Sequence, residues 1–377
     1  MATNTDIPQG YKATALGIIP QEWKTIRLKD CFSISAGGDV QKDCFSEAPS
    51  LQYKYPIYSN SLFNHGLYGF TSHPRHKANS ITITGRGALG HAEYREIDFD
   101  AIVRLLVLAP KIPLNGQYIT EYINFRKPFF YESTGVPQLT APQIANIQVL
   151  FPPLGEQRKI AEVLGVWDKA IEKQARLIEK LALRKRGLMQ RLLSAKLRLP
   201  GFSEPWKKVK LGDVAELYQP QTIQSEDLSQ TGYPVYGANG LIGYYNNYNH
   251  EYPQVVITCR GSSCGTVNFT PGKCWITGNA MVLNVDNNRD VNKSFFYYLI
   301  SNSSFVNLIS GSGQPQIVRQ PLLKFELRIP PLKEQTAIAE VLTAADREID
   351  LAKEKLERLR RQKRGLMQQL LTGKKRI

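Results

Sequence analysis

Two short loops in this chain contain residue types that bind phosphates and nucleic-acid bases. The loop GRGALG at residues 85–90 follows a predicted strand and matches the glycine spacing of dinucleotide-binding loops. No apolar-faced helix follows it, and the corresponding CRGSSCG at residues 259–265 lacks that spacing, so we predict no dinucleotide site. Both copies keep Arg-Gly, and the guanidinium of Arg86 or Arg260 can contact a phosphate or a guanine edge. The alternative is an ion pair within the fold.

A second loop pair offers glutamines among small residues. STGVPQL at residues 133–139 corresponds to SGSGQPQI at residues 310–317. Small residues expose backbone N–H groups, and the amides of Gln138 and Gln316 suit bidentate contact with adenine. The loops have an alternative role as caps on the domain before the helix that follows.

Aromatic, basic and amide side chains alternate in two further segments, a composition that suits contacts with bases and phosphates. The candidates for DNA binding here are Lys54, Tyr58, Asn60, Tyr236 and Asn239. Tyrosines serve structural roles as often, so both readings stay open for Tyr58 and Tyr236.

The usual catalytic motifs are missing from the sequence. There is no phosphate-binding Gly-Lys-Ser/Thr loop, no His-Glu-x-x-His and no Asn-Pro-Pro-Tyr motif of amino-methylation, and the five histidines have no ligand spacing that recurs. The five cysteines are odd in number and form no Cys-x-x-Cys pair, so we expect reduced thiols and neither disulfides nor metal. A binding protein without catalytic residues is expected.

An internal duplication determines the architecture. Residues 151–199 align without a gap onto residues 329–377, whereas residues 20–150 and 203–328 share only a sparse framework. The framework pairs are Trp23/Trp206, Leu28/Leu211, Tyr55/Tyr233, Pro56/Pro234, Tyr58/Tyr236, Arg86/Arg260, Gly87/Gly261, Gly135/Gly313, Pro137/Pro315 and Gln138/Gln316. The pattern predicts one scaffold that carries two different variable domains.

Each repeat is predicted to be a long helix. Apolar residues recur at alternating spacings of four and three from Ile160 to Leu192 and from Ile338 to Leu370, which is a heptad seam. About 42 helical residues would span about 60 Å. The second helix begins where the first ends, so we expect an antiparallel pair within the chain and the C-terminus beside the first domain. The alternative is that each helix pairs with another copy.

The variable domains are predicted to be strand-rich with short helices. The expected strands are Ser80–Thr84, Ala101–Leu108, Val255–Thr258 and Ala280–Val285, and the expected helices are Tyr118–Phe125 and Asn292–Asn302. The formal net charge of +15 lies mostly on the repeats and suggests a polyanionic partner or acidic protein surfaces. No stretch is apolar enough to span a membrane, and the start MATNTDIPQGYK has no signal-peptide core, so we expect a cytoplasmic protein.

These motifs together resemble the specificity subunit of type I restriction-modification systems over nearly the whole chain. The resemblance rests on the segments PPLGEQ, IAEVL and RGLMQRLL of the first repeat, PGFSEPWKKVKLGDV after it, and IPPLKEQ and RGLMQQLLTGKKR of the second repeat. It implies an α+β fold with two strand-rich target recognition domains, separated by two long helices that form an intramolecular antiparallel coiled coil with a pseudo-two-fold axis. The domain boundaries that we expect are 1–150, 151–199, 200–328 and 329–377.

The resemblance also implies a function without catalysis in this chain. Each variable domain would read one half of a bipartite, asymmetric site in double-stranded DNA, and the helices would set the spacer and dock two methyltransferase subunits. Candidates for partner binding are Glu156, Gln157, Glu334 and Gln335. S-adenosylmethionine, ATP and Mg are expected on partner subunits, which can include restriction and translocase subunits. The alternatives are a stand-alone two-module DNA-binding regulator and an assembly scaffold whose variable domains bind protein.

Overall fold

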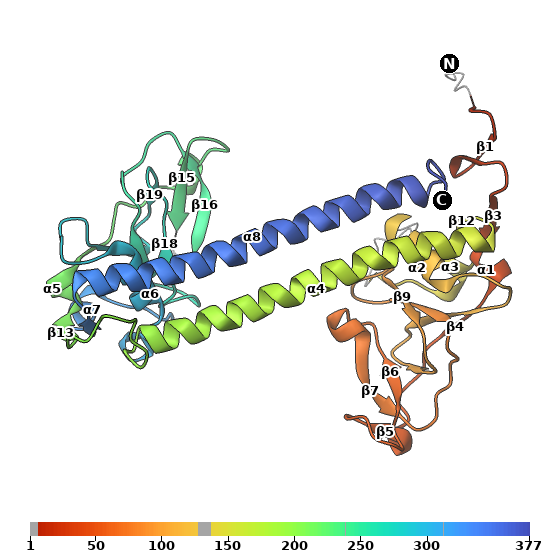
Figure 1. Cartoon of the computed structure of the whole chain (residues 1–377), viewed down its shortest axis with the longest axis horizontal. Coiled ribbons are helices and arrows are strands. Elements are labelled where there is room, and N and C mark those ends of the chain that lie inside the picture. Colours follow the sequence, from red (N-terminus) through yellow and green to blue (C-terminus); the bar gives the residue numbers. More distant parts are fainter. Residues whose placement is uncertain (1–6, 127–136, 238, 312) are drawn as a thin grey trace. The chain divides into compact units, whose positions relative to one another are not determined.

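The computed structural model describes residues 7–126, 137–237, 239–311 and 313–377. Compact packing divides the chain into a first unit, Met1–Gln174 with Lys355–Ile377, and a second unit, Ala175–Glu354. Each long helix therefore contributes to both units, and Figure 1 labels their elements. Among the described residues, none of the helices has both the length and the apolar character of a membrane span.

The described residues of the first unit form two four-stranded sheets and two two-stranded sheets. The main sheet has the order β4-β11-β8-β9, a second has the order β10-β6-β7-β5, and β12-β3 and β1-β2 are two-stranded. The elements are β1 (Tyr11–Thr14), β2 (Gly17–Pro20), β3 (Lys24–Arg27), α1 (Leu28–Cys31), β4 (Phe32–Ala36), β5 (Phe45–Ser46), β6 (Tyr55–Tyr58), β7 (Leu67–Thr71), β8 (Ser80–Ile83), β9 (Ala92–Arg95), β10 (Asp100–Ala101), β11 (Leu106–Pro110), α2 (Gly116–Arg126), α3 (Ala141–Ala145), β12 (Gln148–Phe151) and the long helix α4 (Leu154–Leu192).

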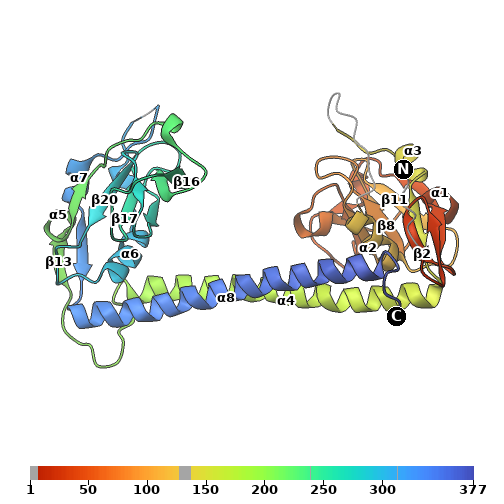
Figure 2. The same cartoon turned by 90° about the horizontal axis from the view of Figure 1, so that it is seen from above.

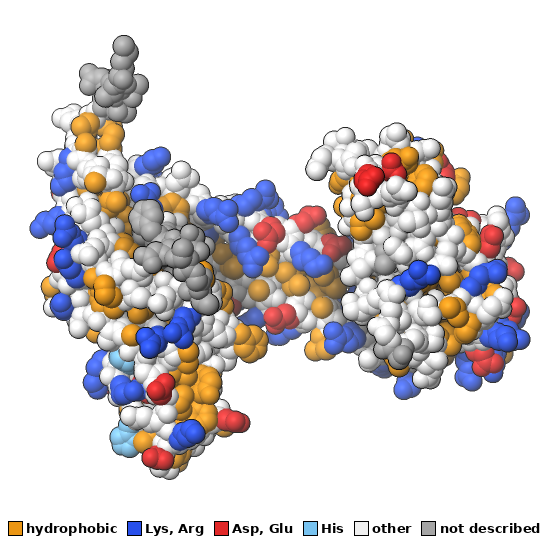
Figure 3. Space-filling model, turned by 180° about the vertical axis from the view of Figure 1, so that it is seen from behind, with side chains coloured by type: hydrophobic (Ala, Val, Ile, Leu, Met, Phe, Trp, Pro, Cys, Tyr) orange, Lys and Arg blue, Asp and Glu red, His pale blue; other side chains and the backbone are white. Residues whose placement is uncertain are grey.

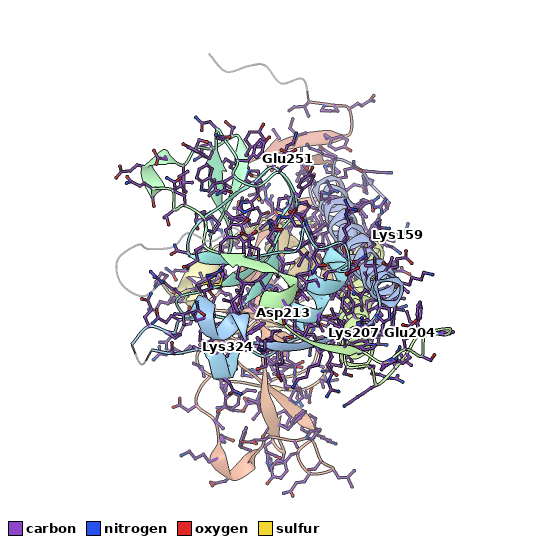
Figure 4. All side chains as sticks on the ribbon, turned by 90° about the vertical axis from the view of Figure 1, so that its left-hand side faces the viewer. Lys159, Glu204, Lys207, Asp213, Glu251 and Lys324 are labelled. Carbon is purple, nitrogen blue, oxygen red and sulfur yellow. The ribbon has the colours of Figure 1, made fainter. Side chains whose placement is uncertain are left out.

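The second unit repeats this plan with different residues. Its main sheet has the order β14-β20-β17-β18, beside β16-β15-β19 and β13-β21. The elements are β13 (Lys207–Lys210), α5 (Leu211–Val214), β14 (Glu216–Tyr218), β15 (Tyr233–Gly237), β16 (Gly240–Tyr245), β17 (Val255–Thr258), β18 (Val267–Phe269), β19 (Trp275–Ile276), β20 (Ala280–Asn284), α6 (Lys293–Ser301), α7 (Arg319–Leu323), β21 (Glu326–Ile329) and the long helix α8 (Leu332–Leu370). At the start of α5, Asp213, labelled in Figure 4, accepts a hydrogen bond from the Lys210 N–H at 3.1 Å.

The predicted strands and helices are largely confirmed, with one correction. The expected strand Ala101–Leu108 is wrong, because β10 ends at Ala101 and β11 begins only at Leu106. Between them, Val103 and Arg104 have left-handed backbone angles, with φ of 54° and 59°. A strand cannot continue through that conformation, and the β-branched composition of the segment concealed the turn.

The repeats form helices of 39 residues each, three fewer than predicted, and their seam residues are buried or half-buried. In the second unit, Leu181 packs with Ile349 and Ala352. In the first, Lys363 of α8 pairs with Asp168 of α4 at 2.6 Å. In Figure 2, α2 lies beside the long helices in the first unit, and α6 lies beside them in the second. The predicted antiparallel pairing within the chain is confirmed.

A buried carboxylate anchors the beginning of each long helix. In the first unit, Trp23 donates its indole N–H to Glu156 at 2.9 Å, and Arg376 binds both Glu156 oxygens at 3.1 and 3.0 Å. In the second, Glu334 accepts from Trp206 at 3.3 Å and from Arg198 at 2.6 and 2.8 Å. The C-terminal segment therefore packs in the first unit, as predicted.

We predict that Arg376→Ala destabilises the first unit by about 1–3 kcal/mol, because it removes both hydrogen bonds that Arg376 donates to the buried Glu156 carboxylate. Hydrogen exchange on the full chain should speed up in the first unit and stay unchanged in the second. Lys374→Ala, at an exposed position of the same segment, serves as the control. Equal loss of protection in both units would contradict the assignment.

The two units differ in the residue of α2 or α6 that contacts a Lys–Asp ion pair between the long helices. Lys363 Nζ lies 2.9 Å from Glu121 of α2 and 2.6 Å from Asp168. At the corresponding place in the second unit, Lys185 pairs with Asp346, and the neutral Tyr298 of α6 donates to Asp346 at 2.7 Å. Burial raises the pKa of the Glu121 carboxyl to about 7. The nearby Asp168 also raises this pKa, whereas the charge of Lys363 lowers it.

The first unit should therefore lose stability as the pH rises from about 5 to 8. Unfolded Glu121 releases its proton near the ordinary value of 4.5, whereas the folded carboxyl keeps it until about pH 7. Glu121→Gln should flatten this dependence, since a neutral amide replaces the titrating group. Urea unfolding across this pH range measures the effect, with the exposed Glu96→Gln as the control. A variant with the wild-type pH slope would exclude Glu121 as its source.

Candidate nucleic-acid interface

The structure brings the predicted arginine and glutamine together in the second unit. Arg260 and Gln316 form an isolated antiparallel bridge. Two backbone bonds flank it, from Gly261 N to Pro315 O and from Ile317 N to Cys259 O, each 3.0 Å long. Directly opposite residues in an antiparallel pair project to the same side, with Cβ atoms about 5 Å apart. One ligand edge can therefore contact both side chains.

The first unit repeats half of this arrangement among its described residues. Leu139 N donates to Gly85 O at 2.9 Å, the counterpart of the Ile317 to Cys259 bond. Arg86 and Gln138 are the immediate neighbours of the two bonded residues, and both are exposed. The part of the predicted glutamine loop at residues 133–136 lies outside the described residues.

Among the described residues, the structure shows no ion pair of Arg86 or Arg260. In the described parts of the chain, no hydrogen bond or ion pair engages the guanidinium of Arg86 or Arg260. Both side chains are exposed. The described contacts therefore include no internal salt bridge of either arginine, and a contact with an external anion or base edge stays a prediction.

Asn60 joins the loops of the first unit. Its side-chain amide donates to Val103 O at 2.6 Å, and its side-chain oxygen accepts from Gly85 N at 2.7 Å. These bonds tie the end of the β6 hairpin to the Arg86 loop and to the turn before β11. A direct DNA contact by Asn60 stays a prediction, and the contacts that the structure shows are those of a brace.

The tyrosine candidates have internal roles in each unit. The Arg95 guanidinium lies 3.6 Å from the centre of the half-buried Tyr58 ring, and the Tyr58 carbonyl accepts from Ile102 N at 3.0 Å. Tyr236 packs on a small apolar cluster, and its carbonyl accepts from Thr277 N at 2.9 Å. The contacts that the structure shows for Tyr58 and Tyr236 are therefore contacts within the fold.

Two other candidates lie in exposed positions. Lys54 precedes β6, away from the hydrogen-bonded loops at the end of that strand, and its Nζ is 5.0 Å from the Tyr55 ring centre. Asn239 lies in the turn between β15 and β16. Their DNA contacts stay predictions.

The four partner-binding candidates are buried and bonded within the chain. Besides the two glutamates at the helix starts, Gln157 donates to Pro152 O at 2.8 Å and accepts from Asn115 N at 2.9 Å. Gln335 donates to Pro330 O and accepts from Asn292 N, both at 2.9 Å. A partner-binding role for Glu156, Gln157, Glu334 and Gln335 stays a prediction, and the contacts seen here join each helix start to its domain.

Comparison with known proteins identifies the family. The family model described as "Type I restriction modification DNA specificity domain" matches residues 20–182 and 203–361. The chain belongs to this family. Its role is that of a type I specificity subunit, which recognises the DNA target in a restriction-modification complex. This result does not favour the stand-alone regulator or the protein-binding scaffold.

Individual relatives agree over nearly the full length. The MjaVIII specificity subunit of Methanocaldococcus jannaschii is 22% identical, with 95% of this chain and 94% of the relative covered. The putative MjaX specificity subunit of the same organism is 25% identical, with 98% and 97% covered. The type I S subunit of M. genitalium has the same fold, with a TM-score of 0.66 at 18% identity over 93% of this chain and 96% of that one.

We predict that Arg86→Ala weakens DNA binding by the assembled complex by about 1–3 kcal/mol and relaxes discrimination in one half-site only. Arg260→Ala should do the same in the other half-site, so each variant serves as the control for its counterpart. Competition binding with singly substituted duplexes measures both. Unchanged base discrimination in both variants would remove the arginines from direct reading.

Proposed function

We propose that each unit reads one half of a bipartite, asymmetric DNA site. The observation that carries this proposal is the repetition of one sheet order and one loop arrangement with different surface residues. The same backbone arrangement in both units would present one DNA-contacting surface on each. Because the side chains on these two surfaces differ, we expect the two half-sites to differ in sequence. In this proposal, the paired helices set the number of base pairs between the half-sites.

We also propose that the repeated helices dock two methyltransferase subunits. Figure 3 shows apolar side chains exposed among charged ones along these helices. Val166 is 64% exposed in the first unit and Leu351 is 65% exposed in the second. Such side chains are available to an apolar partner surface. These two side chains differ between the repeats, since Val166 aligns with Ala344 and Leu351 with Lys173, so a partner surface bound twice has to use the positions that both helices share.

Two equivalent glycines support this docking. Gly187 and Gly365 lie inside long helices, where glycine costs about 1 kcal/mol relative to alanine. An added Cβ at either position meets no atom of the described chain within 4 Å. Internal packing therefore does not require these glycines, although both repeats keep them. A closely approaching partner helix would require them.

The chemistry would reside in the partners. We propose that this chain is non-catalytic and that methyltransferase subunits bind S-adenosylmethionine and methylate adenine. Restriction and translocase subunits would use ATP and Mg for translocation and cleavage. Relatives named as specificity subunits support this division of labour.

Co-expression of the chain with its candidate methyltransferase, followed by genome-wide mapping of N6-methyladenine, tests the proposal. A new bipartite motif with two different halves is the expected result. A continuous or palindromic motif, or no motif from a stably assembled complex, would overturn it.

A pair of glycine variants tests the docking surface. Gly187→Leu with Gly365→Leu should raise helix propensity, so the thermal midpoint of the chain should not fall, while copurification of the methyltransferase is lost. Gly155→Leu is the matched control, because the second repeat already has Lys333 at that position. Retention of both methyltransferases by the double variant would exclude this surface.

A further inference from the structure

The turn before β11 has an unusual backbone that its surroundings impose. Val103 and Arg104 adopt φ of 54° and 59°, a region that residues other than glycine rarely occupy, least of all valine. Val103 N donates to Gly38 O at 2.9 Å, and Arg104 N donates to Gly37 O at 3.0 Å. The Asn60 amide holds the Val103 carbonyl from the other side. Strained backbone of this kind persists where neighbours fix it, and it is concentrated at functional sites.

Arg104 lies against the loops that carry Arg86 and Gln138. A Cβ added to Gly85 would lie 2.9 Å from Leu139 O and 3.1 Å from Arg104 O. Gly85 therefore packs between the backbones of the other two loops. Arg104 lies two residues before β11, Arg86 follows Gly85 and Gln138 precedes Leu139, so three exposed polar side chains start from one junction.

The Arg104 guanidinium is available for an external partner. Its side chain is exposed, and no hydrogen bond or ion pair in the described parts of the chain engages it. Two other arginines of the same unit are committed, since Arg75 pairs with Asp100 at 2.7 Å and Arg95 donates to Thr82 at 2.9 Å. Arg104 therefore has a fixed backbone and an uncommitted side chain.

The second unit places an asparagine at the equivalent position. Thr277 N donates to Tyr236 O as Ile102 N donates to Tyr58 O, and Ala280 N donates to Thr277 O as Leu105 N donates to Ile102 O. These bonds align Asn279 with Arg104. Cys259, the counterpart of Gly85, donates its N–H to Asn279 O at 3.2 Å.

We propose that Arg104 and Asn279 are equivalent base-reading positions, a third on each surface. This inference rests on the proposed reading of one half-site by each unit. A guanidinium suits the O6 and N7 acceptors of guanine, whereas an amide suits N6 and N7 of adenine. The presence of Arg104 in one unit and Asn279 in the other would then contribute to the difference between the two half-sites.

Arg104→Ala, Arg104→Lys and Arg104→Gly in the assembled methyltransferase complex test this assignment. All three should lower discrimination at one base pair of one half-site by a factor of about 5 to 150, because none offers a bidentate guanidinium. Glycine suits the left-handed backbone, so its loss of discrimination cannot come from a disrupted turn. Asn279→Ala should act on the other half-site, and the exposed Arg27→Ala on β3 is the control.

Competition binding against duplexes substituted one base pair at a time gives the outcomes. Unchanged preference in the Arg104 variants overturns the assignment, and so does a uniform loss of affinity that lysine restores, since that result indicates a phosphate contact. A wild-type complex without any base preference in one half-site would instead contradict the proposed function. Wild-type discrimination therefore separates failure of this inference from failure of the function on which it rests.

Discussion

Each unit of this protein depends on a carboxylate that is buried at the start of a long helix. Glu156 and Glu334 each accept from a tryptophan of the domain and from an arginine that follows the opposite helix. Three segments far apart in the sequence therefore meet at one charge, which would be unstable there without its donors. Because an arginine after α4 serves the second unit and one after α8 serves the first, neither unit is complete without both repeats. This accounts for the presence of the same glutamate and arginine in both repeats.

Backbone bonds within each variable domain hold the loops that carry its exposed side chains. Sheet order, the bonds that link Leu139 to Gly85 and Ile317 to Cys259, and the carbonyls of Tyr58 and Tyr236 do not depend on particular side chains at the surface. Side chains between these fixed points can change at little cost to stability. A subunit that recognises a DNA target can use this separation, since the exposed side chains can vary while the backbone that carries them stays the same.

The sequence predicted the repeat, the antiparallel helices, most of the strands and the equivalence of Arg86 with Arg260. These features leave periodic or duplicated signals. The turn at Val103 and Arg104 could not be predicted, because β-branched residues there indicate a strand, and only contacts from residues 37, 38 and 60 impose the left-handed angles. The buried roles of Gln157 and Gln335 were equally hidden. A polar residue that occurs in both repeats can have a structural or a binding role, and the sequence alone does not distinguish the two until the contacts of the residue are known.

The comparison of the two units also shows which side chains can differ at equivalent positions of the duplicated fold. Glu121 and Tyr298 occupy equivalent places beside a Lys–Asp pair. Tyr298 donates a hydrogen bond to Asp346, and a protonated Glu121 can donate one to Asp168. The first unit thus reproduces with a titratable acid what the second does with a phenol. The Lys–Asp pair is common to both units, whereas the residue of α2 or α6 beside it differs, so the fold does not require one side-chain type at that place. The same reasoning applies at the reading surface, where a shared position can carry an arginine in one unit and an asparagine in the other without any change of frame.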